Sequence, residues 1–153
     1  MKFLPNWLRS SFLQKPVTSG RSLLIAKSAQ ELLLPHQNLL QQIRSQVSVP
    51  ESHWMNLYQS FIKSFAELVQ QLPASESHHH AFAGGLLQHS LEVGLHALQL
   101  RSGKMLPLGA SPEVISEKQE LWSYAVLTAA MMHDIGKPLV DQFDYHPLIQ
   151  FLL

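Results

Sequence analysis

Histidine is concentrated in one short part of this chain. Residues 75–93 read SESHHHAFAGGLLQHSLEV and hold four of its nine histidines, three of them in a row and then His89 after a pair of glycines. A second stretch, residues 131–139, reads MMHDIGKPL and sets His133 beside Asp134. Imidazole nitrogens and carboxylate oxygens are ligands that suit a divalent cation. We therefore expect the two stretches to meet in space and to hold metal.

The His133–Asp134 pair stands near the end of a predicted helix and close to a positive charge. Neighbouring helical residues are about 100° apart around the axis, so both side chains can lean toward one point beside it. Lys137 would bring an ammonium group to the same place. A cation with a nearby lysine suits a phosphate group, because the metal polarises a phosphoryl oxygen and lowers the pKa of bound water. The pair alone also fits an ordinary helix C-terminus, where His and Lys interact favourably with the dipole.

His89 is the expected third ligand. It lies on a predicted helix and follows small residues that allow another backbone to approach. One histidine from this helix and a His–Asp pair ending a later helix give three ligands from two packed helices, as in metal sites of helix bundles. His96 is on the same face but two turns, roughly 10 Å, further along. It cannot share the ion, so we assign it to packing or to the surface.

The histidine triplet His78, His79 and His80 lies in the loop before the His89 helix. Adjacent imidazoles point in different directions, so all three cannot bind one ion. We expect at least one to bind a second metal or a phosphate, and take His79 and His80, with Lys137, as catalytic candidates. The alternative is a polar loop that is merely rich in histidine. Two acidic residues are candidates for supporting the ligands: Glu76, and Glu92, which could orient His89 or face solvent.

Helical patterns account for the first half of the chain after a leader. Residues 1–22 are expected to be irregular. The capping-box pair Ser28 and Glu31 predicts a helix start, and Pro35 interrupts or restarts this helix, which then continues to Pro50. Residues 51–72 carry the strongest helical stripe. Its apolar positions are Trp54, Leu57, Tyr58, Phe61, Phe65, Leu68, Val69 and Leu72.

The second half of the chain predicts two further helices. One begins near Gly84–Gly85 and runs to about residue 100, with four leucines on one side: Leu87, Leu91, Leu95 and Leu98. Residues 101–118 are expected to form a loop because they contain glycines and prolines. The last helix is expected at residues 121–135, with Gly136 as a left-handed cap. No alternating strand pattern of useful length occurs. The predicted class is all-α, with residues 23–153 as one domain.

Composition limits the possible functions. Hydrophobic residues make up 46% of the chain and charged residues 14%, which is typical of a compact globule. The formal net charge is zero, whereas nucleic-acid-binding proteins usually carry a basic excess. The absence of cysteine excludes disulfides and thiolate metal sites and is compatible with the cytoplasm. No signal peptide or apolar run of membrane-spanning length is found, so we expect no contact with a membrane.

The stretch LPASESHHHAFAGGLLQHSLEV, which begins at Leu72, together with HDIGKPL from His133, resembles a known family. The chain is similar to TraI-like conjugative relaxases of the MOBH class, within the HD superfamily of metal-dependent phosphohydrolases. This resemblance implies an HD-domain-like helical bundle with His89, His133 and Asp134 as metal ligands. It also implies a DNA phosphodiesterase or nickase of integrative and conjugative elements that uses Mn, Mg or Fe. DNA and other conjugation proteins are the implied partners, through the full-length protein.

One element of the HD pattern is not found. The family's final Asp ligand lies well beyond the His–Asp pair, and Asp141 and Asp144 follow too closely to replace it. We therefore expect a bundle that is incomplete at its C-terminus, from the N-terminal portion of a larger relaxase. Two alternatives stay open: an HD-type hydrolase of free nucleotides, and an inactive truncated module that only binds. A relaxase with a tyrosine nucleophile is disfavoured, because its paired histidines need a strand to present them.

Overall fold

The computed structural model describes residues 26–74 and 80–136. Within these ranges the chain consists of helices and connecting turns, which confirms the predicted all-α class. The predicted leader, residues 1–22, lies outside the described part of the chain. The proposed division into leader and domain therefore stays a prediction.

The first helical segment begins where the capping pattern predicts. It comprises α2 (Ala29–Leu33), the 3₁₀ turn η1 (Leu34–His36) and α3 (Gln37–Ser45). The Ser28 hydroxyl accepts from the backbone N–H of Glu31, and the Glu31 carboxylate accepts in return from the Ser28 N–H at 2.8 Å. This reciprocal pair satisfies two N–H groups that a helix start leaves without partners. Pro35 lies in the 3₁₀ turn, because proline has no N–H for the α-helical ladder.

The second helical segment is one long rod with a widened middle. It comprises α4 (Glu51–His53), the π-helical turn η2 (Trp54–Gln59) and α5 (Ser60–Val69). Trp54, Tyr58 and Ile62 are buried at successive steps of four, since a π-helical turn holds more residues than an α-helical one. The predicted stripe is therefore wrong at Leu57 and Leu68, which are 47% and 66% exposed.

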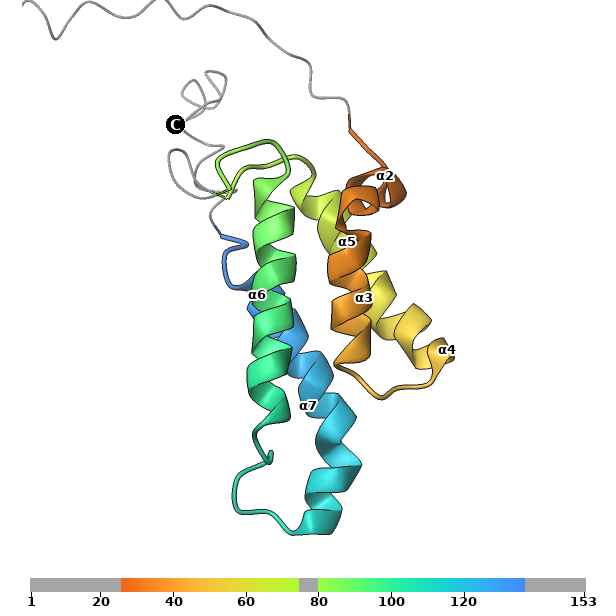
Figure 1. The fold of residues 1–153 in the computed structure, drawn as a ribbon, viewed down its shortest axis with the longest axis vertical. Coiled ribbons are helices and arrows are strands. Elements are labelled where there is room, and N and C mark those ends of the chain that lie inside the picture. Colours follow the sequence, from red (N-terminus) through yellow and green to blue (C-terminus); the bar gives the residue numbers. More distant parts are fainter. Residues whose placement is uncertain (1–25, 75–79, 137–153) are drawn as a thin grey trace, which may run out of the picture.

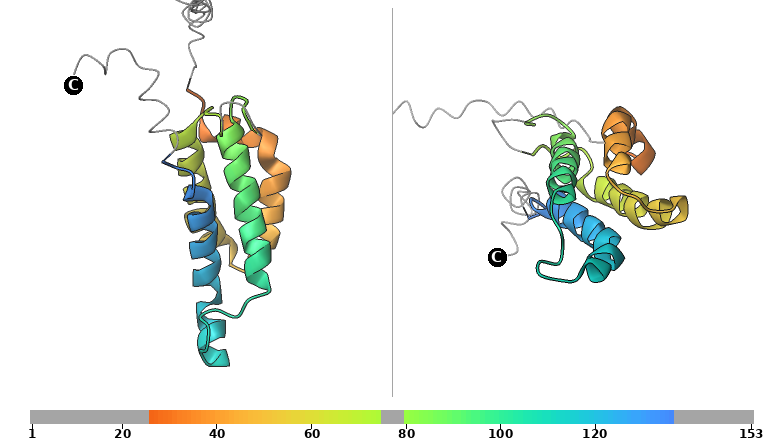
Figure 2. Two further views of the ribbon diagram at one scale, coloured as in Figure 1. Left: turned by 90° about the vertical axis from the view of Figure 1, so that its left-hand side faces the viewer. Right: turned by 60° about the horizontal axis from the view of Figure 1, so that its bottom comes forward.

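The third unit is an antiparallel hairpin of α6 (Gly85–Ser102) and α7 (Pro112–Met132) (Figures 1 and 2). Gly94 lies at the centre of their contact. A Cβ atom at this position would meet the Leu127 side chain at 2.8 Å and the Met131 side chain at 3.1 Å. The missing side chain thus allows close approach of the two helices. The hairpin brings the first turns of α6 beside the last turns of α7.

Two sequence expectations about α7 are wrong. Residues 112–118 were expected in a loop, but α7 begins at Pro112 after Ser111, because proline is favoured in the first turn of a helix. Gly136 was expected as a left-handed cap, but it does not adopt a positive φ. The helix ends earlier, at Met132, and residues 133–136 form turns.

A single core joins these units. α6 packs against both α7 and α3, and α2 packs on α5 (Figure 1). The leucines predicted for one side of α6 are all buried: Leu87, Leu91, Leu95 and Leu98. Tyr58 connects the rod to α7 through an edge-to-face contact with Tyr124 at 5.2 Å between ring centroids. None of the helices in the described ranges is both long and apolar enough to span a membrane.

Candidate metal centre

His89, His133 and Asp134 converge, as the sequence predicts. Each offers one ligand atom, and the three atoms lie within 4.8 Å of one another. The Asp134 Oδ2 atom is 3.7 Å from His89 Nε2 and 3.4 Å from His133 Nε2. The helix hairpin produces this meeting, because His89 is on the second turn of α6 and the other two residues directly follow α7.

The spacing of these atoms suits a divalent cation. Bonds of about 2.0–2.2 Å to nitrogen and oxygen place two ligand atoms of one ion about 3.0–3.5 Å apart. The two distances to Asp134 Oδ2 are within a few tenths of an ångström of that range. The Asp134 side chain is only 14% exposed, while His133 is 40% exposed. The cluster is thus anchored on a largely buried carboxylate and remains accessible from the His133 side.

The His133 ring is held in the tautomer that a metal ligand requires. Its Nδ1 atom lies 2.7 Å from the carbonyl oxygen of Ala130, which can only accept a hydrogen bond. A neutral His133 therefore donates from Nδ1 and keeps the lone pair of Nε2, the atom that faces Asp134. A backbone carbonyl behind the ligating ring is a common support in metal sites. The same contact satisfies a carbonyl of the last α7 turn.

His80 extends the cluster along α6. Its ring centroid is 5.4 Å from that of His89, and its Nε2 is 3.2 Å from the Glu92 carboxylate. Gln88 donates to the other oxygen of Glu92 at 2.8 Å. Glu92, which the sequence suggests as a support for His89 or as a solvated acid, pairs with His80. Sequence spacing missed this because the loop carrying His80 folds back over α6.

The chain around His80 is shaped by two glycines. His80 has φ +63°, and Gly84 has φ +86°, which suits a residue without a Cβ atom. At Gly85 a Cβ atom would overlap the carbonyl oxygen of His80 and lie 2.7 Å from its carbonyl carbon. The glycine pair therefore lets the loop pass directly over the start of α6. In the described part of the chain, the buried Nδ1 atom of His80 has no hydrogen-bond partner.

Several predicted residues are not part of this geometry. His78, His79, Glu76 and Lys137 lie outside the described residues. His96 is exposed on α6 and is not one of the residues that meet in the cluster. This agrees with its assignment to packing or surface.

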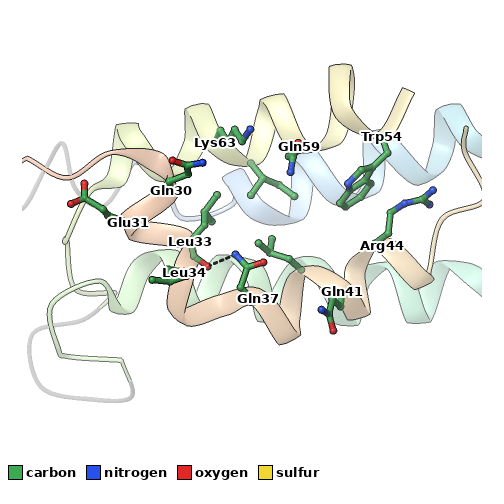
Figure 3. Close-up of a pocket in the computed structure, with 12 residues that line it drawn as sticks. Gln30, Glu31, Leu33, Leu34, Gln37, Gln41, Arg44, Trp54, Gln59 and Lys63 are labelled. Atoms are coloured by element: carbon green, nitrogen blue, oxygen red, sulfur yellow. Dashed lines mark hydrogen bonds between the residues drawn. The ribbon is translucent and has the colours of Figure 1, made fainter. Parts of the chain in front are cut away.

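A larger cavity lies elsewhere, between the α2–α3 segment and the η2–α5 rod (Figure 3). Its volume is about 780 Å³, and its wall combines leucines with the amides of Gln30, Gln37, Gln41 and Gln59. At one end Arg44 lies over the Trp54 ring at 5.3 Å and donates to the carbonyl oxygens of Val47 and Val49. We call this the amide groove. None of the three cluster residues lines it.

Comparison with protein families identifies the family to which the chain belongs. Residues 22–144 match the TraI_2 family, whose description is "Putative helicase". The chain belongs to this family. It is thereby a TraI-like conjugation protein. The match contains the cluster and both helices that carry it. No curated protein and no solved structure matches the chain.

Proposed function

We propose that this chain forms the metal-binding part of a DNA phosphodiesterase of conjugative transfer, a relaxase of the MOBH class with an HD-type site. The observation that carries the proposal is the convergence of His89, near the start of α6, with His133 and Asp134, which directly follow α7. The family supports a role in conjugation and DNA processing. The cluster adds a site of the kind that hydrolyses phosphate esters.

The residues have separable roles in this proposal. His89 and His133 supply neutral nitrogen ligands, and Asp134 supplies negative charge between them. A divalent cation bound there would polarise a phosphoryl oxygen and lower the pKa of a bound water. His80, whose Nε2 pairs with Glu92 and whose ring lies beside that of His89, is proposed to help shape the phosphate site. Lys137 and His79 are proposed to contribute to the same phosphate site.

The helicase description of the family does not explain this cluster. A nucleotide-driven motor binds phosphates through a glycine-rich loop of the form G-x-x-x-x-G-K-[ST]. The sequence of residues 1–153 contains no such motif. The chemistry available in the described residues is that of imidazole and carboxylate, which favours metal-dependent hydrolysis over a motor for this part of the chain.

Nicking of supercoiled plasmid with Mn²⁺ or Mg²⁺ tests the proposal. Asp134 is the one carboxylate of the cluster. Fixing a metal-bound phosphodiester normally needs more anionic oxygen. We therefore expect weak nicking by the 153-residue chain and faster nicking by a longer chain that supplies a further Asp. In the longer chain, Asp134→Ala should abolish nicking and His96→Ala should not.

The outcomes separate the proposal from its alternatives. Robust nicking by the 153-residue chain that is lost with Asp134→Ala would show that a further ligand is unnecessary. Hydrolysis of free nucleotides without nicking would favour a nucleotide phosphohydrolase. Metal binding without turnover in either chain would leave a binding module and overturn the enzymatic role.

A further inference from the structure

A small cavity opens at the start of α6, and Phe82, which contacts His80, lines it. It lies between the α2–η1 segment, the end of the rod and the start of α6, and its volume is about 200 Å³. Cavities that bind whole small molecules usually measure about 300–1,000 Å³. This one suits a single planar group of a larger ligand.

The wall of this cavity combines an aromatic ring with polar groups. Phe82 lines it and is 52% exposed, which is unusual for a phenylalanine in a packed domain. Gln71, Gln88 and His36 also line it and make this part of the wall polar, with the Gln88 amide donating to Glu92. Burial lowers the pKa of His36, so that its ring is neutral at pH 7 and able both to donate and to accept. A flat ring face with amide and imidazole groups around it is the arrangement that recognises a nucleobase.

A series of ring contacts connects the cavity to the metal ligands. The Phe82 ring centroid is 5.9 Å from that of His80, and His80 is 5.4 Å from His89. Phe82 is therefore connected to the metal ligand His89 through one intervening ring, that of His80. A nucleotide whose base lies in the cavity and whose phosphate lies at the cluster would extend past the His80 ring.

We infer that the Phe82 cavity binds a nucleobase of the substrate whose phosphate lies at the metal centre. The base stacks on Phe82 and is therefore unpaired, either in single-stranded or extrahelical DNA or in a free nucleotide. The phosphate's place rests on the proposed function, while the stacking of the base rests on the cavity itself. Phe82 acts as a positioning residue.

Fluorescence of 2-aminopurine tests the inference, with the full 153-residue chain in Mn²⁺. The probes are a single-stranded oligonucleotide with one 2-aminopurine, the same strand with an abasic position instead, and the free 2-aminopurine deoxynucleoside monophosphate. Stacking should quench the 2-aminopurine fluorescence. Phe82→Ala should weaken binding of the base-bearing strand about tenfold, or about 1.4 kcal/mol, because the base loses its stacking partner. The abasic strand should be insensitive to the substitution.

Matched variants separate stacking from a structural effect. Phe82→Tyr keeps the ring and should restore affinity, whereas Phe82→Leu keeps an apolar side chain without a ring face and should not. Leu108→Ala, at a residue that is 84% exposed in the loop after α6, should change nothing. Tight, Phe82-dependent binding of the strand alone identifies DNA as the source of the base. Equally tight binding of the monophosphate identifies a free nucleotide.

Elemental analysis of bound Mn²⁺ distinguishes failure of this inference from failure of the proposed function. Bound metal in every variant, without Phe82-dependent quenching, overturns the base cavity and leaves the metal centre intact. Absence of metal from the unmodified chain overturns the proposed function, while Phe82-dependent quenching would still support the base cavity.

Discussion

The amide groove and the metal centre differ in how the chain builds them. The groove is about 780 Å³, but its lining comes from residues 30–63, which adjoin one another in sequence. The metal centre joins residues far apart in sequence, His89 on α6 with His133 and Asp134 directly after α7. The polar groups of the groove are mostly neutral amides, and its Arg44 is held by carbonyl oxygens. A large cavity therefore indicates only that a ligand could fit, whereas convergent ligand atoms indicate which chemistry the site could perform.

Removal of a metal ligand should have the largest effect, because it changes the metal centre and leaves the amide groove unchanged. Asp134→Ala deletes the charged oxygen that faces both histidines, and we expect loss of most bound divalent metal, more than tenfold in affinity. His89→Ala should act in the same direction. Elemental analysis after equilibrium dialysis against Mn²⁺ measures this.

Two control substitutions belong to that experiment. His96→Ala changes an exposed histidine of the same helix, and Gln41→Ala changes an exposed amide of the groove. Both should retain the metal content of the unmodified chain. Equal content in all four variants would refute the assignment of the metal centre.

A second substitution tests whether the close approach of the loop to the start of α6 positions His80 beside the metal centre. In Gly85→Ala the new methyl group would overlap the His80 carbonyl, so the loop must shift and carry His80 away from Glu92. We expect a loss of about 1–3 kcal/mol in the free energy of unfolding, together with weaker metal binding. Urea unfolding and elemental analysis measure the two effects.

The opposite end of α6 provides the matched control. At Gly103 a Cβ atom would have its nearest neighbour at 3.8 Å, and φ is −85°. Gly103→Ala should therefore leave stability and metal content nearly unchanged. If the two glycine variants behave alike, the close approach at Gly85 does not position His80.

The smallest expected effect concerns the groove. Arg44→Ala removes two hydrogen bonds to carbonyl oxygens and the contact with Trp54, which should lower the free energy of unfolding by about 1–2 kcal/mol. Bound metal should not change. Glu51→Gln should cost less than about 0.5 kcal/mol, because this exposed carboxylate lies 3.5 Å from the arginine. A loss of metal in Arg44→Ala would show that the two regions are coupled.

Sequence periodicity predicted the helices better than their faces and ends. The helix start at Ser28 and the buried leucines of α6 follow from local rules and are confirmed. Leu57 and Leu68 were misplaced because a π-helical turn alters the register, and no residue type marks such a turn. Pro112 was interpreted as a loop signal, although proline also begins helices. The Pro112 error thus arises because one residue type serves two structures, whereas the π-helical turn has no residue type that marks it.

By itself, the sequence determined the all-α class and the types of ligand available. The absence of cysteine excludes thiolate ligands, and the histidines and the neighbouring aspartate offer nitrogen and oxygen donors. The sequence also indicated that His89, His133 and Asp134 should meet. The tertiary structure placed His80, the one member of the triplet that it describes, beside His89, and it paired Glu92 with His80. The physical reason is that periodicity constrains neighbours along one helix, whereas contacts between helices depend on packing, here on the absence of a side chain at Gly94 and Gly85.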